Sequence, residues 1–118
     1  MLIFYLKEKL KKEFENERLL QRNRGRDQAE KIKTRLANID AARDLAELEN
    51  LPGNHHPLHA DKSGLWACSL NGNYRLIYEP WPSPPATLPG GGLDKQSITK
   101  VRIHGVLDYH ERKNKKPQ

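Results

Sequence analysis

The pair Asn71-Gly72, with an apolar run on each side, is the feature that most restricts how this chain can fold. Asparagine and glycine both tolerate the positive φ angles of a tight type I′ turn. The flanking runs Leu65–Leu70 and Asn73–Glu79 have the length of strands. The sequence therefore predicts an antiparallel hairpin in its second half.

The register of this hairpin decides which side chains meet. With Asn71 and Gly72 as the only turn residues, Arg75 would lie opposite Cys68, on the same face as Trp66 and Ile77. The other face would then be apolar enough to be covered by helices, and it would carry Leu65, Ala67, Leu76 and Tyr78. A slip of one residue would exchange the two faces.

The first half of the chain is highly charged and predicts helices. Leu2–Leu6 is short enough to be a strand or the start of a helix, and we favour a strand. A surface helix is expected from Glu8 to about Arg22, ending before Gly25. A second helix should begin at Asp27, which forms a capping-box pattern with Glu30.

This second helix should pack against a core, because four apolar residues share one of its faces, namely Ala29, Ile32, Leu36 and Ile39. Lys31, Lys33 and Arg35 mostly point elsewhere. Asp40 is expected to cap a further short helix that runs through Leu48. Pro52-Gly53 then ends the helical half.

Two further segments follow the hairpin. Residues 80–97 hold five of the eight prolines and three consecutive glycines, so a long irregular loop is expected there. Ile98–Val106 predicts a third strand, with Val101 and Ile103 on one face and with Lys100, Arg102 and His104 on the other. Residues 111–118 form a basic tail without apolar anchors.

Composition limits the class of protein. A chain of 118 residues fits one domain, here residues 1–118, and the helices followed by strands predict an α+β fold. The net charge of +6 favours a polyanionic partner such as nucleic acid. One cysteine, Cys68, favours a reducing compartment, so we expect a cytoplasmic protein, and no apolar run approaches the length of a membrane span.

Three histidines, His55, His56 and His59, lie within five residues just before the hairpin. As a metal site they lack a fourth ligand nearby, and Pro57 stiffens the backbone between them, so we expect neither a metal nor a cofactor. As acid-base groups, only one of them needs to lie beside a reacting proton. Solvent-facing loop histidines are the remaining interpretation.

A second polar group follows the third strand. Asp108-Tyr109-His110 places three adjacent titratable residues at a strand end, which is unlike core packing, although Tyr109 alone could fill space. Arg75 stands in the middle of a strand, where it must reach solvent, pair with an acid such as Glu79, or bind an anion. Its planar guanidinium suits a phosphate.

Taken in order, these motifs resemble the HigB-type toxins of the RelE superfamily, the killer halves of bacterial toxin–antitoxin pairs. The resemblance rests on Leu51-Pro52-Gly53, His56-Pro57-Leu58, Asp61, Gly64, Asn71-Gly72-Asn73-Tyr74-Arg75 and Asp108-Tyr109-His110. It implies a RelE-like fold, in which a pair of N-terminal helices packs on a small, twisted, mainly antiparallel sheet of three to four strands.

The resemblance also implies an activity, the cleavage of messenger RNA in the ribosomal A site, and neutralisation by a small helix-turn-helix antitoxin of the HigA type. The implied catalytic residues are His56, Arg75, Asp108, Tyr109 and His110. Neighbouring positions expected to contact RNA are His59, Lys62, Lys100 and Arg102. The chain departs from the family in having His59-Ala60 where Lys-Gly is usual, so either Lys62 supplies the missing charge or cleavage is weaker.

Two other functions are compatible with the same resemblance. ParE-like proteins share the fold and inhibit DNA gyrase through a protein contact, without catalysis. A degenerate toxin could persist as a regulatory partner of its antitoxin. Arg75 and the Asp108–His110 run favour RNA chemistry over the non-catalytic binder, because a binder does not need titratable residues that converge near a strand end, and the degenerate toxin remains open.

Overall fold

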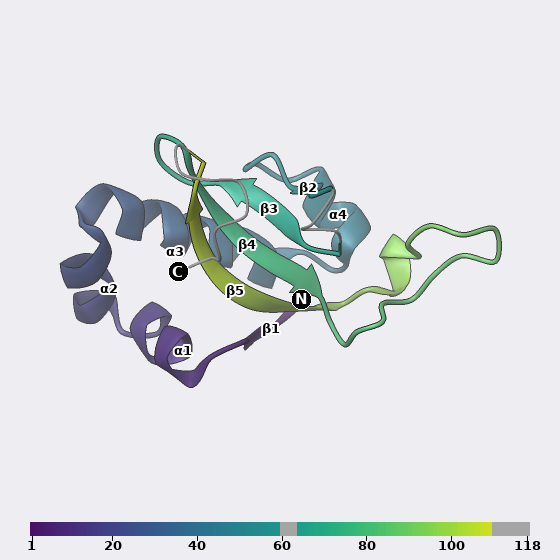
Figure 1. Ribbon diagram of the computed structural model, residues 1–118, viewed down its shortest axis with the longest axis horizontal. Helices are drawn as coiled ribbons and strands as arrows, with labels where there is room; N and C mark the ends of the chain where they lie inside the picture. Colours follow the sequence, from purple (N-terminus) through teal and green to yellow (C-terminus); the bar gives the residue numbers. More distant parts are fainter. Residues whose placement is uncertain (60–63, 110–118) are drawn as a thin grey trace.

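The computed structural model describes residues 1–59 and 64–109 (Figure 1). Strand β1 (Leu2–Tyr5) is followed by helices α1 (Glu8–Phe14), α2 (Glu17–Arg24), α3 (Arg26–Ala41) and α4 (Leu45–Glu49). The remaining strands are β2 (His56–Pro57), β3 (Trp66–Ser69), β4 (Tyr74–Pro80) and β5 (Lys100–Asp108), and the short 3-10 helix η2 (Lys95–Ser97) precedes β5. Within these residues no helix is long and apolar enough to cross a membrane.

The strands form one sheet in the order β1-β5-β4-β3-β2. All neighbouring pairs are antiparallel except β1 and β5, which run parallel. The predicted α+β class and the mainly antiparallel sheet are confirmed, and the arrangement is consistent with a RelE-like fold. The prediction of three to four strands was wrong, because β1 and the two-residue β2 extend the sheet to five. The helices are also more than a pair.

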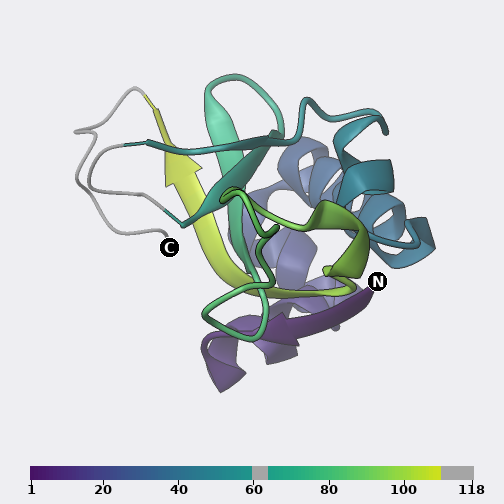
Figure 2. The same cartoon turned by 90° about the vertical axis from the view of Figure 1, so that its right-hand side faces the viewer.

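The helices cover one face of this sheet, which we call the inner face (Figures 1 and 2). The core between them is built from helix residues that include Leu20, Ile32 and Leu48, from Leu70 directly after β3, and from the strand residues Trp66, Cys68, Leu76, Tyr78, Val101, Ile103 and Val106. On the opposite, outer face a smaller apolar cluster joins Ala67, Ile77 and Leu107, with Leu58 and Leu65 packed against it.

The hairpin between β3 and β4 forms, but its register differs by one residue from the prediction. Arg75 lies opposite Ser69, and Cys68 lies opposite Leu76. The connection is a three-residue loop because Leu70 and Tyr74 still pair, and only Gly72 has a positive φ, of +53°, so a type I′ turn is absent. This register turns Trp66 to the inner face and Ala67 to the outer face.

Helix boundaries also differ from those predicted. The expected helix from Glu8 to Arg22 is two helices, because the Asn16 side chain accepts a hydrogen bond from the Leu19 amide at 3.1 Å and starts α2 anew. Helix α3 begins at Arg26 and has no side-chain cap, so the predicted capping box at Asp27 does not form. Asp44 caps α4 instead of Asp40, through the Glu47 amide at 2.9 Å.

Arg35 was expected to point away from the core, and this was wrong. Its side chain is buried, and its Nε donates to the Ser69 carbonyl at 2.7 Å. This bond ties helix α3 to the end of strand β3, where the sheet would otherwise leave a carbonyl without a partner. The apolar face of the helix is otherwise as predicted, with Leu36 only partly buried.

Residues 80–97 project from one end of the body as a long excursion (Figure 1). Most of it is irregular, as predicted, but Thr87 bridges Leu93 and η2 returns the chain to the body. There the Lys95 ammonium contacts the Glu49 carboxylate at 2.9 Å, which fixes η2 beside α4. The basic tail 111–118 lies outside the described residues.

Candidate functional site

Arg75 lies on the outer face of the sheet, in β4, between Ser69 of β3 and Leu107 of β5. Its Nη1 donates to the Tyr74 carbonyl at 2.9 Å and to the Gly72 carbonyl at 3.3 Å. The described part of the chain gives it no carboxylate partner, and Glu79 is engaged elsewhere. A guanidinium held by neutral carbonyls retains its charge for an anion.

Tyr109 meets this arginine on the same face. The guanidinium carbon of Arg75 lies 5.3 Å from the centroid of the Tyr109 ring, and the Tyr109 amide donates to the Asn73 carbonyl at 3.0 Å. Burial raises the pKa of the Tyr109 hydroxyl, and this effect is larger than the lowering that the Arg75 charge causes. The hydroxyl is therefore protonated at neutral pH, and the ring is 41% exposed.

A β-bulge in β5 is what brings Tyr109 to the outer face. Ile77 pairs with Gly105 and Tyr78 pairs with Ile103, so His104 is an extra residue on its strand. Gly105 has φ +143°, a conformation that side chains rarely adopt. Before the bulge the even-numbered residues face outward, and after it the odd-numbered residues do, which places Tyr109 beside Arg75.

Asp108 is not brought to the same side. It pairs with Tyr74 at the end of β5 and is half-buried, and strand alternation directs it away from Arg75 and Tyr109. His110 and Lys62 lie outside the described residues. Of the three-residue run at 108–110, the structure therefore joins only Tyr109 to Arg75 within the part of the chain that it describes.

His56 is on the outer face, but two strands away. It pairs with Ala67 in β2, and its Nδ1 lies 2.8 Å from the Asn54 carbonyl. From standard strand spacings its Cα lies about 12 Å from that of Arg75. An RNA backbone could therefore contact both side chains.

The neighbouring histidines have different environments. His55 points into the inner face, where its Nδ1 lies 2.8 Å from the Tyr78 hydroxyl, and burial lowers its pKa to about 4. His59 is exposed. Residues 1–59 and 64–109 contain no group of three histidine, cysteine, aspartate or glutamate residues arranged to hold a metal ion.

Sequence reasoning missed a polar cluster farther along the outer face. The Glu79 carboxylate accepts a hydrogen bond from Arg102 at 3.0 Å, and it also contacts Nε2 of the His104 ring. The Arg102 guanidinium also lies over the Trp81 ring, 3.9 Å from its centroid. Arg102, expected as an RNA contact, is thus both paired and stacked, while Lys100 of the same strand is half-buried. The sequence signal that could have revealed this cluster is the alternation of Lys100, Arg102 and His104, which places all three on one face of the strand.

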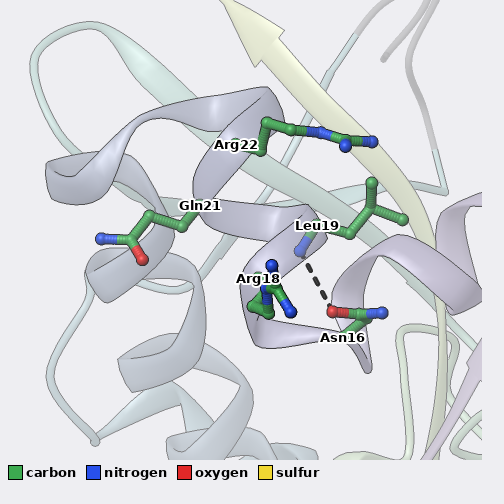
Figure 3. Close-up of a pocket in the computed structure, with 5 residues that line it drawn as sticks. All are labelled: Asn16, Arg18, Leu19, Gln21 and Arg22. Atoms are coloured by element: carbon green, nitrogen blue, oxygen red, sulfur yellow. Dashed lines mark hydrogen bonds between the residues drawn. The ribbon is translucent and has the colours of Figure 1, made fainter.

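An open hollow on helix α2 lies away from these residues (Figure 3). It is lined by Asn16, Arg18, Leu19, Gln21 and Arg22. Figure 3 shows the two arginine side chains extending in different directions, with Leu19 between them. They do not converge on one point, so the hollow lacks the arrangement of an anion site.

Comparison with known proteins gives one partial similarity. No protein family model matches the chain. The endoribonuclease HigB of Proteus vulgaris is 32% identical over 50 residues, which make up 42% of this chain. The chain thus matches about half, 54%, of the length of that relative. The similarity is to an RNA-cutting protein, and it covers a part of each chain.

Proposed function

We propose that this protein is the toxin of a toxin–antitoxin pair, a metal-independent endoribonuclease that acts on messenger RNA in the ribosomal A site. The observation that carries the proposal is the cation–π contact of Arg75 with Tyr109 on the outer face of the sheet. The partial similarity to endoribonuclease HigB supports the same class of activity. The partners in this proposal are messenger RNA on the ribosome and a helix-turn-helix antitoxin, and the compartment is the cytoplasm.

RNA carries its own nucleophile, so the protein needs only acid-base and electrostatic groups. In the proposed reaction the ribose 2′-oxygen attacks the adjacent phosphorus and the bond from phosphorus to the 5′-oxygen breaks, which leaves a 2′,3′-cyclic phosphate. One histidine accepts the 2′-hydroxyl proton, and a second acid protonates the leaving 5′-oxygen. We assign proton transfer to His56 or His110.

Arg75 would stabilise the negative charge that develops on the phosphorane oxygens. Among the described residues its guanidinium is held by backbone carbonyls and by no carboxylate, so its charge remains available. Tyr109 would stack on a base next to the cut, because its ring is 41% exposed and its hydroxyl stays protonated at neutral pH. Because strand alternation directs Asp108 away from Arg75 and Tyr109, we assign it to holding a histidine outside this pair and not to contact with the phosphate.

The test is cleavage in a translating extract, with new messenger 5′-ends mapped by primer extension. Wild-type protein should give cuts in register with codons, and the Arg75→Ala, His110→Ala double variant should give none. The matched control is Arg18→Ala, which removes an arginine from helix α2, away from the outer face. Phenanthroline, which binds transition metals and leaves ribosomal Mg²⁺ in place, should not reduce cleavage.

Three other results would each contradict the proposed function or the residues assigned to it. Arrested growth with intact messengers would reject the ribonuclease and favour a gyrase-type inhibitor. Equal cleavage by the wild type and the double variant would reject the assigned residues. Absence of both toxicity and cleavage, with retained antitoxin binding, would identify a degenerate toxin.

A further inference from the structure

We propose that Phe4, Arg102 and Trp81 form a second contact for the RNA, a stacking platform that holds unpaired bases on the outer face of the sheet. This inference rests on the proposed RNA substrate and extends it to residues at the far end of the face from Arg75. The ligand class is single-stranded nucleic acid, bound through its bases.

The three side chains lie side by side on neighbouring strands. Phe4 of β1 pairs in register with Arg102 of β5, which pairs in turn with Glu79 of β4. Trp81 follows the end of β4, where its amide donates to the Lys100 carbonyl at 2.9 Å. The Arg102 guanidinium carbon then lies 3.9 Å from the centroid of the Trp81 ring. The Trp81 ring thus covers the Arg102 guanidinium, and Phe4 occupies the neighbouring cross-strand position on the same face.

Glu79 fixes the orientation of this plane. Its Oε2 accepts from both Nε and Nη2 of Arg102, at 3.3 Å and 3.0 Å, and it also contacts His104. Because the Glu79 carboxylate already pairs with Arg102, the charge of Arg102 is partly compensated, which weakens its attraction for a partner's carboxylate. The face of the guanidinium away from Trp81 and the Trp81 ring itself are suited to stacking, since guanidinium planes and aromatic rings both accept nucleobases. This favours a base over an acidic peptide.

The exposure of the apolar side chains and the charge of their neighbours both suit single-stranded nucleic acid. Phe4 is 41% exposed and Leu2, beside Lys100 on the same face, is 60% exposed. A phenylalanine that keeps 41% of its surface exposed leaves apolar area available to a ligand. At this end of the outer face the two cations Lys100 and Arg102 outnumber the single carboxylate of Glu79. Aromatic rings among cations are the usual platform for single strands.

The spacing allows one strand of RNA to reach both contacts. Arg75 and Glu79 are four residues apart on β4, which corresponds to about 13 Å along the strand. Arg75 and Tyr109 therefore occupy one end of the face, and the platform occupies the other. The apolar cluster of Ala67, Ile77 and Leu107 lies beside this path.

Binding can be measured without cleavage by using a single-stranded 2′-O-methyl oligonucleotide, which has no free nucleophile. Trp66 is buried, 2% exposed, whereas Trp81 is partly exposed, so quenching of protein fluorescence reports on Trp81. We expect quenching by the oligonucleotide. In fluorescence anisotropy, Trp81→Ala and Phe4→Ala should each weaken binding roughly tenfold. Arg102→Lys, which keeps the charge but loses the plane, should weaken it as well.

Leu88→Ala is the matched control, because Leu88 is an exposed apolar residue, 49% exposed, on the projecting segment 80–97. It should bind like wild type, and circular dichroism should show that all variants are folded. No quenching by wild type at saturating oligonucleotide, or unchanged affinity in both Trp81→Ala and Arg102→Lys, would overturn the platform. Equal competition by polyglutamate would overturn it in favour of an acidic peptide.

The outcome is separable from that of the proposed function. Oligonucleotide binding that depends on Trp81, without any messenger cleavage, would keep the platform and reject the ribonuclease. Cleavage that depends on Arg75, with binding and cleavage indifferent to Trp81, would keep the ribonuclease and reject the platform.

Discussion

The Arg75 guanidinium carbon lies 5.3 Å from the centroid of the Tyr109 ring on the outer face of the sheet, although Arg75 belongs to β4 and Tyr109 directly follows β5. Their meeting depends on the antiparallel pairing of β4 with β5 and on the bulge at His104 and Gly105. The arginine supplies a charge and the tyrosine supplies an exposed ring at one point. This is the combination that contact with both a phosphate and its neighbouring base requires.

We predict that the ring of Tyr109 matters more than its hydroxyl. Tyr109→Phe should keep messenger cleavage within about threefold of wild type, whereas Tyr109→Ala should lose roughly tenfold or more, because stacking on one base is worth about 1–3 kcal/mol. The measurement is the initial rate of cleavage in a translating extract. If Tyr109→Phe is as inactive as Tyr109→Ala, the hydroxyl transfers a proton and the stacking role is wrong.

The fold class was predictable from the sequence because its signals are local. Alternation at Val101 and Ile103 and the helical spacing of Ala29, Ile32 and Ile39 each report burial of one face, and the structure confirms both. The hairpin was predictable for the same reason. Its register was not, since Asn71-Gly72 fits a two-residue or a three-residue loop, and the burial of Trp66 against the helices decides between them.

The candidate site was less accessible to sequence reasoning. Arg75 and Tyr109 could each be singled out, but the bulge that unites them inserts one residue into β5, and regular alternation hides it. Glu79 was considered as a partner for Arg75, yet it pairs with Arg102 and His104. Both arginines share a face with Glu79, so only the cross-strand register could show which of them it binds.

Gly53 should not tolerate a side chain. A Cβ atom there would lie 2.7 Å from Nε of the buried Arg35, and the backbone has φ +117°. We predict that Gly53→Ala lowers the free energy of unfolding by about 2 kcal/mol or more, which would lower the melting temperature by several degrees. Gly90→Ala is the control, because nothing lies within 4 Å of a Cβ at that position. Equal melting temperatures for the two variants would contradict the close approach to Arg35.

Cys68 should be inert in the folded protein. It is fully buried in the inner core, and burial raises the pKa of its thiol to about 12. The thiolate is the reactive form, so iodoacetamide at pH 8 should label the native protein only as fast as it unfolds. Mass spectrometry would follow the labelling, with protein in concentrated urea as the reactive control. Rapid labelling of the native protein would show that the core around Cys68 opens.

His55 should make the protein sensitive to acid. Its ring is 3% exposed and contacts the Tyr78 hydroxyl, and burial lowers its pKa to about 4. In the unfolded chain the pKa is near 6.5. The unfolded state therefore binds the proton first, so this contribution to stability is complete above pH 6.5 and is lost as the pH falls from 6.5 toward 4.

Between pH 7.5 and pH 5 this single histidine should lower the free energy of unfolding by roughly 2 kcal/mol. Carboxylates also titrate on acidification, so the contribution of His55 is the difference between the wild type and His55→Gln, which can still bond the Tyr78 hydroxyl but has no titrating ring. Urea unfolding at each pH gives both profiles. His59→Gln changes an exposed histidine and should follow the wild-type profile. If His55→Gln follows it too, the buried ring is not the acid-sensitive group.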